Sequence, residues 1–212
     1  MALRQGTVPK VDRVNHDPSK NQLRRRLRET RNLLTQQEQN AAAHRLVRRL
    51  VTSPFIRSSR RIACYLPNDG EIDPTPLIER LWAMKRQCFL PVLSRLSRDR
   101  LWFAQVLPDT PLALNRFGIP EPAVTARSLL RAQELDLILM PLVGFDLNGN
   151  RLGMGGGFYD RSLEFLRHRS TWHKPRLLGL AHECQRLEAL APEPWDIPLQ
   201  GIVTDRAIYL AD

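Results

Sequence analysis

The sequence predicts an α/β fold in which a sheet is covered on both faces. Two observations indicate this fold. Short apolar runs alternate with segments of helical periodicity along the chain. A glycine-rich loop follows one apolar run and precedes a helical pattern, which is the strand–loop–helix order of α/β proteins. A chain of 212 residues is long enough to bury a core of this kind within one domain.

Two capping boxes predict where the first two helices begin, because each places a Ser or Thr three residues before Gln or Glu. The predicted helices are residues 19–34, with Ser19 and Gln22, and residues 35–51, with Thr35 and Glu38. Pro54 is expected to end the second helix. Residues 1–18 are expected to form a flexible basic tail ahead of one domain that spans residues 19–212.

The remaining elements follow from apolar runs and prolines. The predicted strands are residues 62–66, 88–93, 101–106, 135–140, 177–181, 201–204 and 207–210. Asp73-Pro74 or Thr75-Pro76 starts a helix to about Arg86, since proline suits the first helical turn. Residues 107–125 contain several prolines and are expected to form an irregular connection over the surface or along a cleft. A last helix is predicted over residues 159–168.

The strand ends predict where a ligand would bind. In open α/β sheets, ligands bind outside the carboxyl ends of the strands. The loops after Leu66 and Met140 and the loop around Thr204 are therefore expected to share one crevice.

The net charge of +10 is concentrated in the first 61 residues. That segment holds 15 of the 32 Lys and Arg residues and four of the 22 acidic residues. Such an excess suits a polyanion, either nucleic acid or a small phosphate-bearing molecule. Phe55 is the only aromatic residue in the segment, whereas single-strand binders stack bases on aromatic rings. Much of the run 24–28 is expected to be a solvated helix face, and specific nucleic-acid binding is not expected.

Three scattered cysteines lack the spacing of a metal site. Cys64 and Cys88 lie within apolar runs and are expected to be core residues in a reducing compartment. No apolar stretch approaches the roughly 20 residues that span a bilayer. The basic N-terminus is not followed by the apolar segment of a secretory signal. These features predict a cytoplasmic protein without a membrane partner.

Residues 151–161, Arg-Leu-Gly-Met-Gly-Gly-Gly-Phe-Tyr-Asp-Arg, form the most informative segment. A glycine turn between a strand and a helix exposes backbone N–H groups at the positive end of the helix, which suits an anion. Arg151 and Arg161 add positive charge, and Asp160 places a carboxylate where Mg²⁺ would sit beside phosphates. The alternative is a glycine-rich turn with an ordinary helix cap. We favour a phosphate site.

The loop differs from the two best-known nucleotide fingerprints. No lysine lies near it, so it is not a Walker A loop. Phe158 stands where Gly-x-Gly-x-x-Gly requires its third glycine, so a plain dinucleotide loop is disfavoured.

Weaker candidates surround this loop in the predicted fold. Lys20 and Arg24 lie four residues apart on one helix face and could clamp a triphosphate, or could be solvated cations. Glu71 follows an Asp-Gly turn and could accept from a ligand N–H, or could be a surface carboxylate. Asp205 follows a strand and could join Asp160 in holding Mg²⁺. No Ser-His-Asp order or nucleophile elbow is present, which disfavours covalent hydrolysis.

Several segments together resemble the 5-formyltetrahydrofolate cyclo-ligase family. In the family's order they are Lys20-x-x-Leu-Arg24, Glu71-Ile-Asp, Phe145-Asp146, Gly149-x-Arg-Leu-Gly153, residues 155–160, Trp195-Asp-Ile-Pro198 and Val203-Thr-Asp205. The Arg-Leu-Gly-x-Gly-x-Gly-[Phe/Tyr]-Tyr-Asp stretch is the most specific of them, whereas Lys-x3-Arg alone would carry no meaning. The resemblance covers almost everything after the predicted tail.

The resemblance implies a fold and an activity. The fold is a three-layer α/β/α sandwich with a mostly parallel sheet, similar to the sugar-phosphate isomerase and CoA-transferase group. The activity is an ATP- and Mg²⁺-dependent ring closure of 5-formyltetrahydrofolate to 5,10-methenyltetrahydrofolate, with release of ADP and phosphate. The implied partners are ATP and the folate, and the protein is expected to be a monomer.

The resemblance also assigns roles to residues. It implies ATP binding by Lys20, Arg24, Arg151, Leu152, Gly153, Met154, Gly155, Gly156, Gly157, Phe158 and Tyr159. It implies folate binding by Glu71, Met154, Gly155, Gly156, Gly157 and Phe158. It assigns Mg²⁺ to Asp160 and Asp205, and catalysis to Arg151 and Asp160.

Departures from the family pattern occur within the glycine loop. Met154 and Gly156 stand where many relatives carry Tyr, Arg or Lys, and Phe158 replaces a common Tyr. Two other functions remain open from the residues alone. One is a basic RNA-binding protein whose glycine loop contacts backbone phosphates, and the other is an ATP-free sugar-phosphate isomerase with Glu71 as its base.

Overall fold

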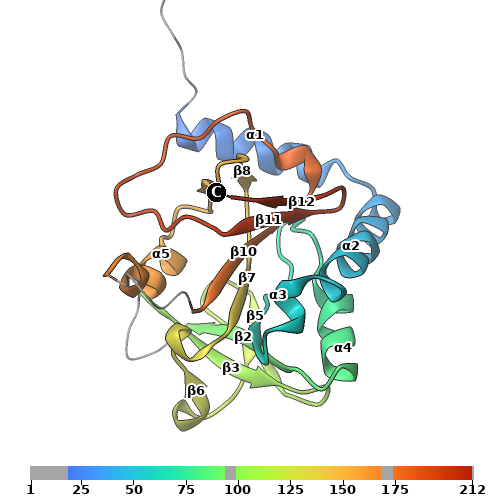
Figure 1. Ribbon diagram of the computed structural model, residues 1–212, viewed down its shortest axis with the longest axis vertical. Coiled ribbons are helices and arrows are strands. Elements are labelled where there is room, and N and C mark those ends of the chain that lie inside the picture. Colours follow the sequence, from blue (N-terminus) through green and yellow to red (C-terminus); the bar gives the residue numbers. More distant parts are fainter. Residues whose placement is uncertain (1–18, 94–98, 169–173, 212) are drawn as a thin grey trace, which may run out of the picture.

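The computed structural model describes residues 19–93, 99–168 and 174–211 (Figure 1). The predicted tail, residues 1–18, lies outside these ranges. An eight-stranded sheet runs through the described residues in the order β12-β11-β10-β7-β1-β2-β3-β6. Its strands are β1 (Arg61–Ala63), β2 (Gln87–Leu93), β3 (Leu101–Val106), β6 (Leu129–Leu130), β7 (Leu137–Pro141), β10 (Arg176–Ala181), β11 (Gly201–Thr204) and β12 (Ile208–Leu210).

The five central strands of the sheet are parallel. β1 pairs in parallel with β2 and β7, and β10 pairs in parallel with β7 and β11. The outer strands β12, β3 and β6 pair antiparallel with their neighbours. The prediction of a mixed α/β fold with a large, mostly parallel sheet is therefore confirmed. Parallel pairing also puts the carboxyl ends of β1, β7, β10 and β11 at one edge, where the predicted loops leave the sheet together.

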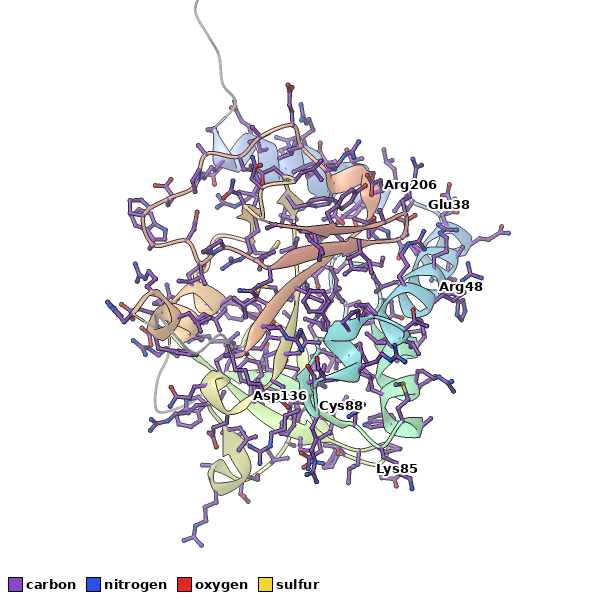
Figure 2. All side chains as sticks on the ribbon, viewed as in Figure 1. Glu38, Arg48, Lys85, Cys88, Asp136 and Arg206 are labelled. Atoms are coloured by element: carbon purple, nitrogen blue, oxygen red, sulfur yellow. The ribbon has the colours of Figure 1, made fainter. Side chains whose placement is uncertain are left out.

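The α-helices of the described residues are α1 (Lys20–Asn32), α2 (Gln36–Val51), α3 (Pro54–Arg57), α4 (Thr75–Ala83) and α5 (Phe158–Leu163). Three of them, α2, α3 and α4, cover one face of the sheet. Side chains of α2, α3 and α4 join those of the central strands in one buried apolar cluster. Figure 2 shows Glu38 and Arg48 projecting outward from α2, whereas Cys88 lies in the interior. This division follows from the amphipathic pattern, which buries Leu46 and Leu50 completely.

The opposite face is covered by α5, by 3₁₀ turns and by loops. Leu163 of α5 packs with Phe145, Leu142 and Ile197 in a second apolar cluster on that face. α5 lies on the other side of the sheet from α2, α3 and α4 in Figure 1. It is shorter than the predicted helix 159–168, because a 3₁₀ segment, Glu164–His168, continues it. The helical layer on this face therefore consists, among the described residues, mainly of one short α-helix and 3₁₀ turns.

α1 lies across the carboxyl edge of the sheet rather than on either face (Figure 1). Leu27 packs against Val143, Leu152 and Leu190 in a third, smaller cluster. Val143 precedes β8 (Gly144–Phe145), and Leu152 is the last residue of β9 (Arg151–Leu152), which pairs with β8 in a hairpin. The Val143 N–H donates to the Leu152 carbonyl at 2.8 Å. The helix thus contacts the chain that leads into the glycine loop.

Both predicted capping boxes are confirmed. The Ser19 and Thr35 side chains accept from the backbone N–H groups of Gln22 and Glu38, whose side chains accept in return. Pro54, expected only to end a helix, also begins α3 at its first position, with Ser53 as the cap. Proline suits this position because its missing N–H would have no helical partner there.

The structure contains two hairpins that the sequence analysis did not predict. β4 (Leu112–Leu114) and β5 (Pro120–Pro122) pair within the connection 107–125. Prolines occupy the register partners of Leu112 and Leu114, which is compatible with an isolated two-stranded pair. The hairpin of β8 and β9 precedes the glycine loop.

All three cysteines are free. Cys64 and Cys88 are buried in the core, as predicted, and burial raises the pKa of the Cys88 thiol to about 12. Cys184 is exposed. Among the described residues, no helix combines the length and apolar composition that crossing a membrane requires.

Candidate functional site

The glycine loop leaves β9 and ends at the first turn of α5. Gly155 and Gly157 have φ angles of 95° and 65°, in the left-handed region that side chains rarely adopt. Gly157 is the N-cap residue of α5, and no side chain caps this helix end. Residues 153–156 are exposed. The loop thus presents its backbone and the helix N-terminus to solvent, which suits an anionic ligand.

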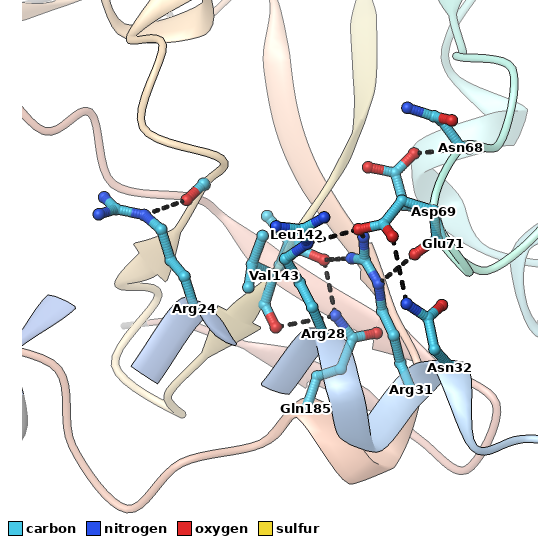
Figure 3. Close-up of polar contacts among 11 residues, drawn as sticks. Arg24, Arg28, Arg31, Asn32, Asn68, Asp69, Glu71, Leu142, Val143 and Gln185 are labelled. Carbon is cyan, nitrogen blue, oxygen red and sulfur yellow. Dashed lines mark hydrogen bonds and ion pairs between the residues drawn. The ribbon is translucent and has the colours of Figure 1, made fainter. Parts of the chain in front are cut away.

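Arg24 joins α1 to this loop. Its Nε donates to the Gly153 carbonyl at 2.8 Å (Figure 3). Its Nη1 donates to the Asn21 side chain at 2.7 Å. A Cβ built on Gly155 would lie 3.5 Å from the guanidinium carbon of Arg24. The guanidinium therefore lies directly beside the glycine backbone, and the contact spans 129 residues of sequence.

Lys20 lies one helical turn before Arg24 and forms an ion pair with Glu193, Nζ to Oε1 at 2.8 Å. Both side chains are about one-third exposed, at 34% and 38%. The chain near Glu193 is fixed locally, because the Glu193 N–H donates to Asp196 at 2.8 Å. A partly exposed pair of this kind contributes little to stability, so Lys20 can exchange Glu193 for an anion at small cost.

Arg151 and Asp160 form an ion pair at the base of the loop. One Nη of Arg151 donates to Asp160 Oδ1, and the other donates to the Ile197 carbonyl. The Arg151 side chain is only 8% exposed, and burial lowers its pKa although the nearby Asp160 opposes that shift. A buried guanidinium that kept no partner would be costly, so Asp160 compensates its charge. The Asp160 side chain is 25% exposed and remains reachable from solvent.

Aromatic side chains lie beside the loop. Phe158 contacts Phe117 edge to face, with ring centroids 5.9 Å apart. Phe117 is exposed and comes from the tip between β4 and β5. The guanidinium of Arg161 lies 5.4 Å from the Phe158 ring centre, and Arg161 also donates to the Gly156 carbonyl at 2.5 Å. An aromatic pair, with Phe117 exposed and Phe158 half-buried, therefore flanks the glycine loop.

Glu71 ends a tight turn that follows β1. Asp69 and Gly70 both have positive φ, 51° and 74°. The Glu71 N–H donates to the Asn68 carbonyl at 3.1 Å, and the Asn68 N–H donates to Glu71 Oε2 at 3.1 Å. The turn borders a cleft of about 220 Å³ that residues of α2 also line. This turn fixes the direction of the Glu71 carboxylate.

Burial raises the pKa of Glu71 to about 7. The Arg31 charge and the Asn68 N–H oppose the shift, and Asp69 adds to it. Glu71 in turn helps to raise the pKa values of Tyr65 and of Tyr159, although burial is the larger cause in both. Tyr159 belongs to α5, so the turn after β1 and the helix after the glycine loop lie within electrostatic range of one another.

Asp205 is almost buried at the end of β11. Its Oδ2 accepts from Arg45 of α2 at 3.1 Å, and its Oδ1 accepts from the Glu183 N–H at 2.9 Å. His182, also buried, has its pKa lowered by burial, against the effect of Asp205. Asp205 and Asp160 thus engage different arginines on different elements.

The described residues hold no group of three or more His, Cys, Asp and Glu side chains that could bind a metal ion on their own. Mg²⁺ usually binds proteins through one or two carboxylates together with substrate phosphates and water. Asp160 fits that pattern because it stands at the end of the loop and is reachable from solvent. Asp205 could bind Mg²⁺ in this way only if Arg45 no longer donated to its Oδ2.

The structure brings most of the predicted residues to one edge of the sheet. Arg24 contacts the glycine loop, Arg151 pairs with Asp160, and Glu71 lies within electrostatic range of Tyr159. The sequence reasoning missed Arg31, Arg45 and Phe117. Arg31 and Arg45 sit among many similar arginines, and Phe117 lies in a hairpin that was predicted as irregular chain.

Comparisons with known proteins identify the family of this chain. The sequence profile described as the 5-formyltetrahydrofolate cyclo-ligase family matches residues 16–205. The chain is 40% identical over 183 residues to 5-formyltetrahydrofolate cyclo-ligase of Escherichia coli K12, covering 86% of this chain and 98% of that protein. It is 40% identical over 184 residues to the enzyme of the same name from Haemophilus influenzae, covering 86% and 95%.

Solved structures show the same fold. The 5,10-methenyltetrahydrofolate synthetase of Aquifex aeolicus superposes with a TM-score of 0.75 at 30% identity, covering 90% of this chain and 92% of that one. The synthetase from Mycoplasma pneumoniae gives a TM-score of 0.68 at 26% identity, covering 89% and 99%. The chain belongs to the 5-formyltetrahydrofolate cyclo-ligase family, a family of ligase enzymes.

Proposed function

We propose that this protein closes the ring of 5-formyltetrahydrofolate to 5,10-methenyltetrahydrofolate and couples the closure to conversion of ATP to ADP and phosphate. Family membership supports the folate reaction. The observation that carries the ATP coupling is the contact of Arg24 with Gly153, which joins a basic helix to an exposed glycine loop at a helix N-terminus. Backbone N–H groups and guanidinium groups together suit a polyphosphate.

The chemistry explains why ATP is needed. An amide oxygen leaves poorly as hydroxide, so the N5-formyl oxygen first attacks the γ-phosphorus and ADP leaves. N10 then attacks the formyl carbon, the N10 proton is lost, and the C–O bond breaks with release of phosphate. The protein's part in phosphoryl transfer is to hold the reactants in line and to neutralise charge.

The nucleotide would lie along the glycine loop. We assign its phosphates to the backbone of residues 152–157 and to the cations Lys20, Arg24 and Arg151, with Phe158 and Tyr159 completing the site. Arg24 contacts this loop from α1 through the Gly153 carbonyl, and Lys20 lies one turn earlier on the same helix, where it pairs with Glu193. Arg151 is buried at the base of the loop, where a guanidinium interacts strongly with a phosphate.

Asp160 would hold Mg²⁺, and Asp205 is the second carboxylate that we propose. When bound, the metal would neutralise phosphate charge and orient the γ-phosphate. Asp160 also accepts a hydrogen bond from Arg151, and we propose both residues as catalytic.

The folate would lie between the glycine loop and the turn that carries Glu71. An ionised Glu71 would accept a hydrogen bond from a folate N–H. Residues 154–158 would contact the ligand from the other side, and the exposed ring of Phe117 beside Phe158 offers a flat apolar surface for an aromatic ring. We also propose that the protein is a cytoplasmic monomer that binds neither a membrane nor a specific nucleic acid.

The test uses absorbance, because the methenyl product has a near-UV chromophore that the substrate lacks. Absorbance should rise only when 5-formyltetrahydrofolate, ATP and Mg²⁺ are all present.

Lys20→Ala should raise the ATP concentration needed for half-maximal rate about tenfold while changing the folate concentration needed for half-maximal rate much less. Glu193→Gln is the matched control, since it removes the same ion pair but keeps the cation. ATP-independent turnover, or release of a sugar-phosphate isomer, would contradict the proposal.

A further inference from the structure

Arg31, in the last turn of α1, is fully buried although it carries a charge. Its Nε donates to the Asp69 carbonyl at 2.7 Å, and its Nη2 donates to Asp69 Oδ2 at 2.9 Å. Its Nη1 donates to the Leu142 carbonyl at 3.2 Å. Burying a guanidinium is costly unless its donors are satisfied, so these three bonds fix its position closely. Figure 3 shows Arg31 between the turn at Asp69 and the chain at Leu142.

The segment that Arg31 holds is the turn that carries Glu71. Asp69 has a positive φ, which is unfavourable for a residue with a side chain and needs support from its surroundings. Arg28 and Asn32 of α1 also donate to the Asp69 carboxylate, at 2.6 Å and 3.1 Å. A Cβ on Gly70 would lie 2.0 Å from the Asn32 side chain, so the turn packs directly on α1.

The same face of α1 reaches the glycine loop. Residues 24, 27 and 31 share a helix face because they are three, four and seven positions apart. Arg24 donates to Gly153, Leu27 packs on Leu152, and Arg31 donates to Leu142. The Leu142 carbonyl also accepts from Gln185 at 2.6 Å, which ties this point to the chain after β10. One rigid helix therefore spans the distance between the proposed nucleotide and folate sites.

We propose that Arg31 is a positioning residue, which acts through the turn at Asp69 to hold the Glu71 carboxylate at a fixed place relative to the glycine loop. This inference rests on the proposed function, because it takes Glu71 as the folate contact. Arg31 itself touches neither substrate.

The surroundings of Glu71 give the proposal a signature in pH. Arg31 faces Glu71 from α1 and lowers its pKa, and Asp69 in the same turn raises it. Tyr65 at the end of β1 and Tyr159 on α5 are the other titratable groups coupled to Glu71. Removal of Arg31 should therefore move the ionisation of Glu71 to higher pH, and removal of the Asp69 charge should move it to lower pH.

The experiment compares Arg31→Met, Arg31→Lys, Asp69→Asn and Arg28→Met with the wild type. Arg28→Met is the matched control, since Arg28 binds the same Asp69 carboxylate but reaches neither the Asp69 carbonyl nor Leu142. In Arg31→Met, the KM for folate should rise about tenfold, and its pH profile should move up by about one unit. The KM for ATP should change less than twofold. Arg31→Lys should restore the pH profile in part, because it keeps the charge.

Calorimetric binding of 5-formyltetrahydrofolate without ATP separates this inference from the proposed function. Folate that binds to the wild type without turnover would overturn the proposed function alone. A folate affinity and pH profile in Arg31→Met equal to those of Arg28→Met would overturn the positioning role. If Arg31→Met does not fold, the pH profile of Asp69→Asn serves as the test instead. A profile of Asp69→Asn that does not move to lower pH would also contradict the proposal.

Discussion

At the scale of single residues, the buried carboxylate of Glu71 lowers the free energy of unfolding when it is ionised. Burial moves its pKa from 4.5 to about 7, so in the folded protein the charged form is disfavoured. Between these two values the unfolded chain binds fewer protons at this residue than the folded chain does. Stability contributed by the protonated group is therefore lost as pH rises through this window. A hydrogen bond to a folate N–H would be the compensation for this unfavourable charge.

We expect Glu71→Gln to stabilise the protein above pH 7 and to have little effect at pH 4. The gain at pH 8 should be about 2–3 kcal/mol, because the neutral amide removes the buried charge but keeps the shape. Denaturant unfolding of both proteins at the two pH values measures it. An equal change at both pH values would mean that Glu71 is not the group that titrates.

Asp160→Asn should separate catalysis from folding. The amide keeps the shape of the side chain but removes the charge that would hold Mg²⁺ and compensate Arg151. Turnover should fall by roughly two to four orders of magnitude, as when an electrostatic contact to the transition state is lost. ATP-dependent methenyl formation and the unfolding midpoint are measured on one preparation. A folded variant with near-wild-type turnover at limiting Mg²⁺ would refute the metal assignment, whereas an unfolded one would make Asp160 a structural partner of Arg151.

At the scale of elements, the glycine loop depends on backbone conformations that few residues adopt. Gly157→Ala should destabilise the protein by about 1–2 kcal/mol and weaken ATP binding, because φ at this position is 65°. A Cβ there would also lie 2.6 Å from Arg161 Nη1. Gly153→Ala is the comparison, since a Cβ at that position meets nothing within 4 Å. Thermal unfolding measures the stability of the two variants, and calorimetry measures their ATP affinity. Equal losses in Gly157→Ala and Gly153→Ala would show that the left-handed conformation is unimportant.

The elements that the sequence predicted well are those with local signals. The capping boxes at Ser19 and Thr35 placed α1 and α2 within two residues of their observed ends, because hydrogen bonds three residues apart determine where a helix starts. The strand 201–204 was predicted without error. The hairpin of β4 and β5 was missed because its strands are three residues long and β5 begins and ends with proline.

Long-range features of the site could not be predicted from the residues alone. Arg31 looks like its solvated neighbours Arg25 and Arg26 in sequence, and only the partners Asp69 and Leu142 distinguish it. The glycine loop was recognisable because the need for positive φ restricts the residue type itself. The pairing of Arg24 with Gly153 required the family resemblance or the structure.

For the whole molecule, the distribution of charge argues against a nucleic-acid surface. Among the described residues 19–61, five cations pair with carboxylates of the protein itself, and these pairs are Lys20–Glu193, Arg25–Glu29, Arg28–Asp69, Arg31–Asp69 and Arg45–Asp205. Four of the five cations meet carboxylates from outside their own helix. Three carboxylates from outside the segment, those of Glu193, Asp69 and Asp205, therefore offset part of its excess charge.

We expect RNA binding to be weak and to disappear with salt. A surface that is merely basic binds phosphates through counterion release, so its affinity falls steeply between about 50 mM and 200 mM salt. Mobility shifts with several RNA sequences at both salt concentrations measure this. Sequence-dependent binding at sub-micromolar concentration that persists at physiological salt would support an RNA-binding protein instead.

The contacts of the two N-terminal helices also bear on how the chain folds. Arg24 meets its partner 129 residues away, Arg45 meets Asp205 across 160 residues, and Lys20 meets Glu193 across 173. During synthesis, α1 and α2 leave the ribosome before the sheet does, yet Glu193 and Asp205, the ion-pair partners of Lys20 and Arg45, emerge much later. Contacts of such large sequence separation are slow to form, because loop closure must be completed before they contribute. The nascent chain therefore exposes its most basic segment until synthesis is nearly complete, and in refolding the recovery of enzymatic activity should lag behind the recovery of helical signal.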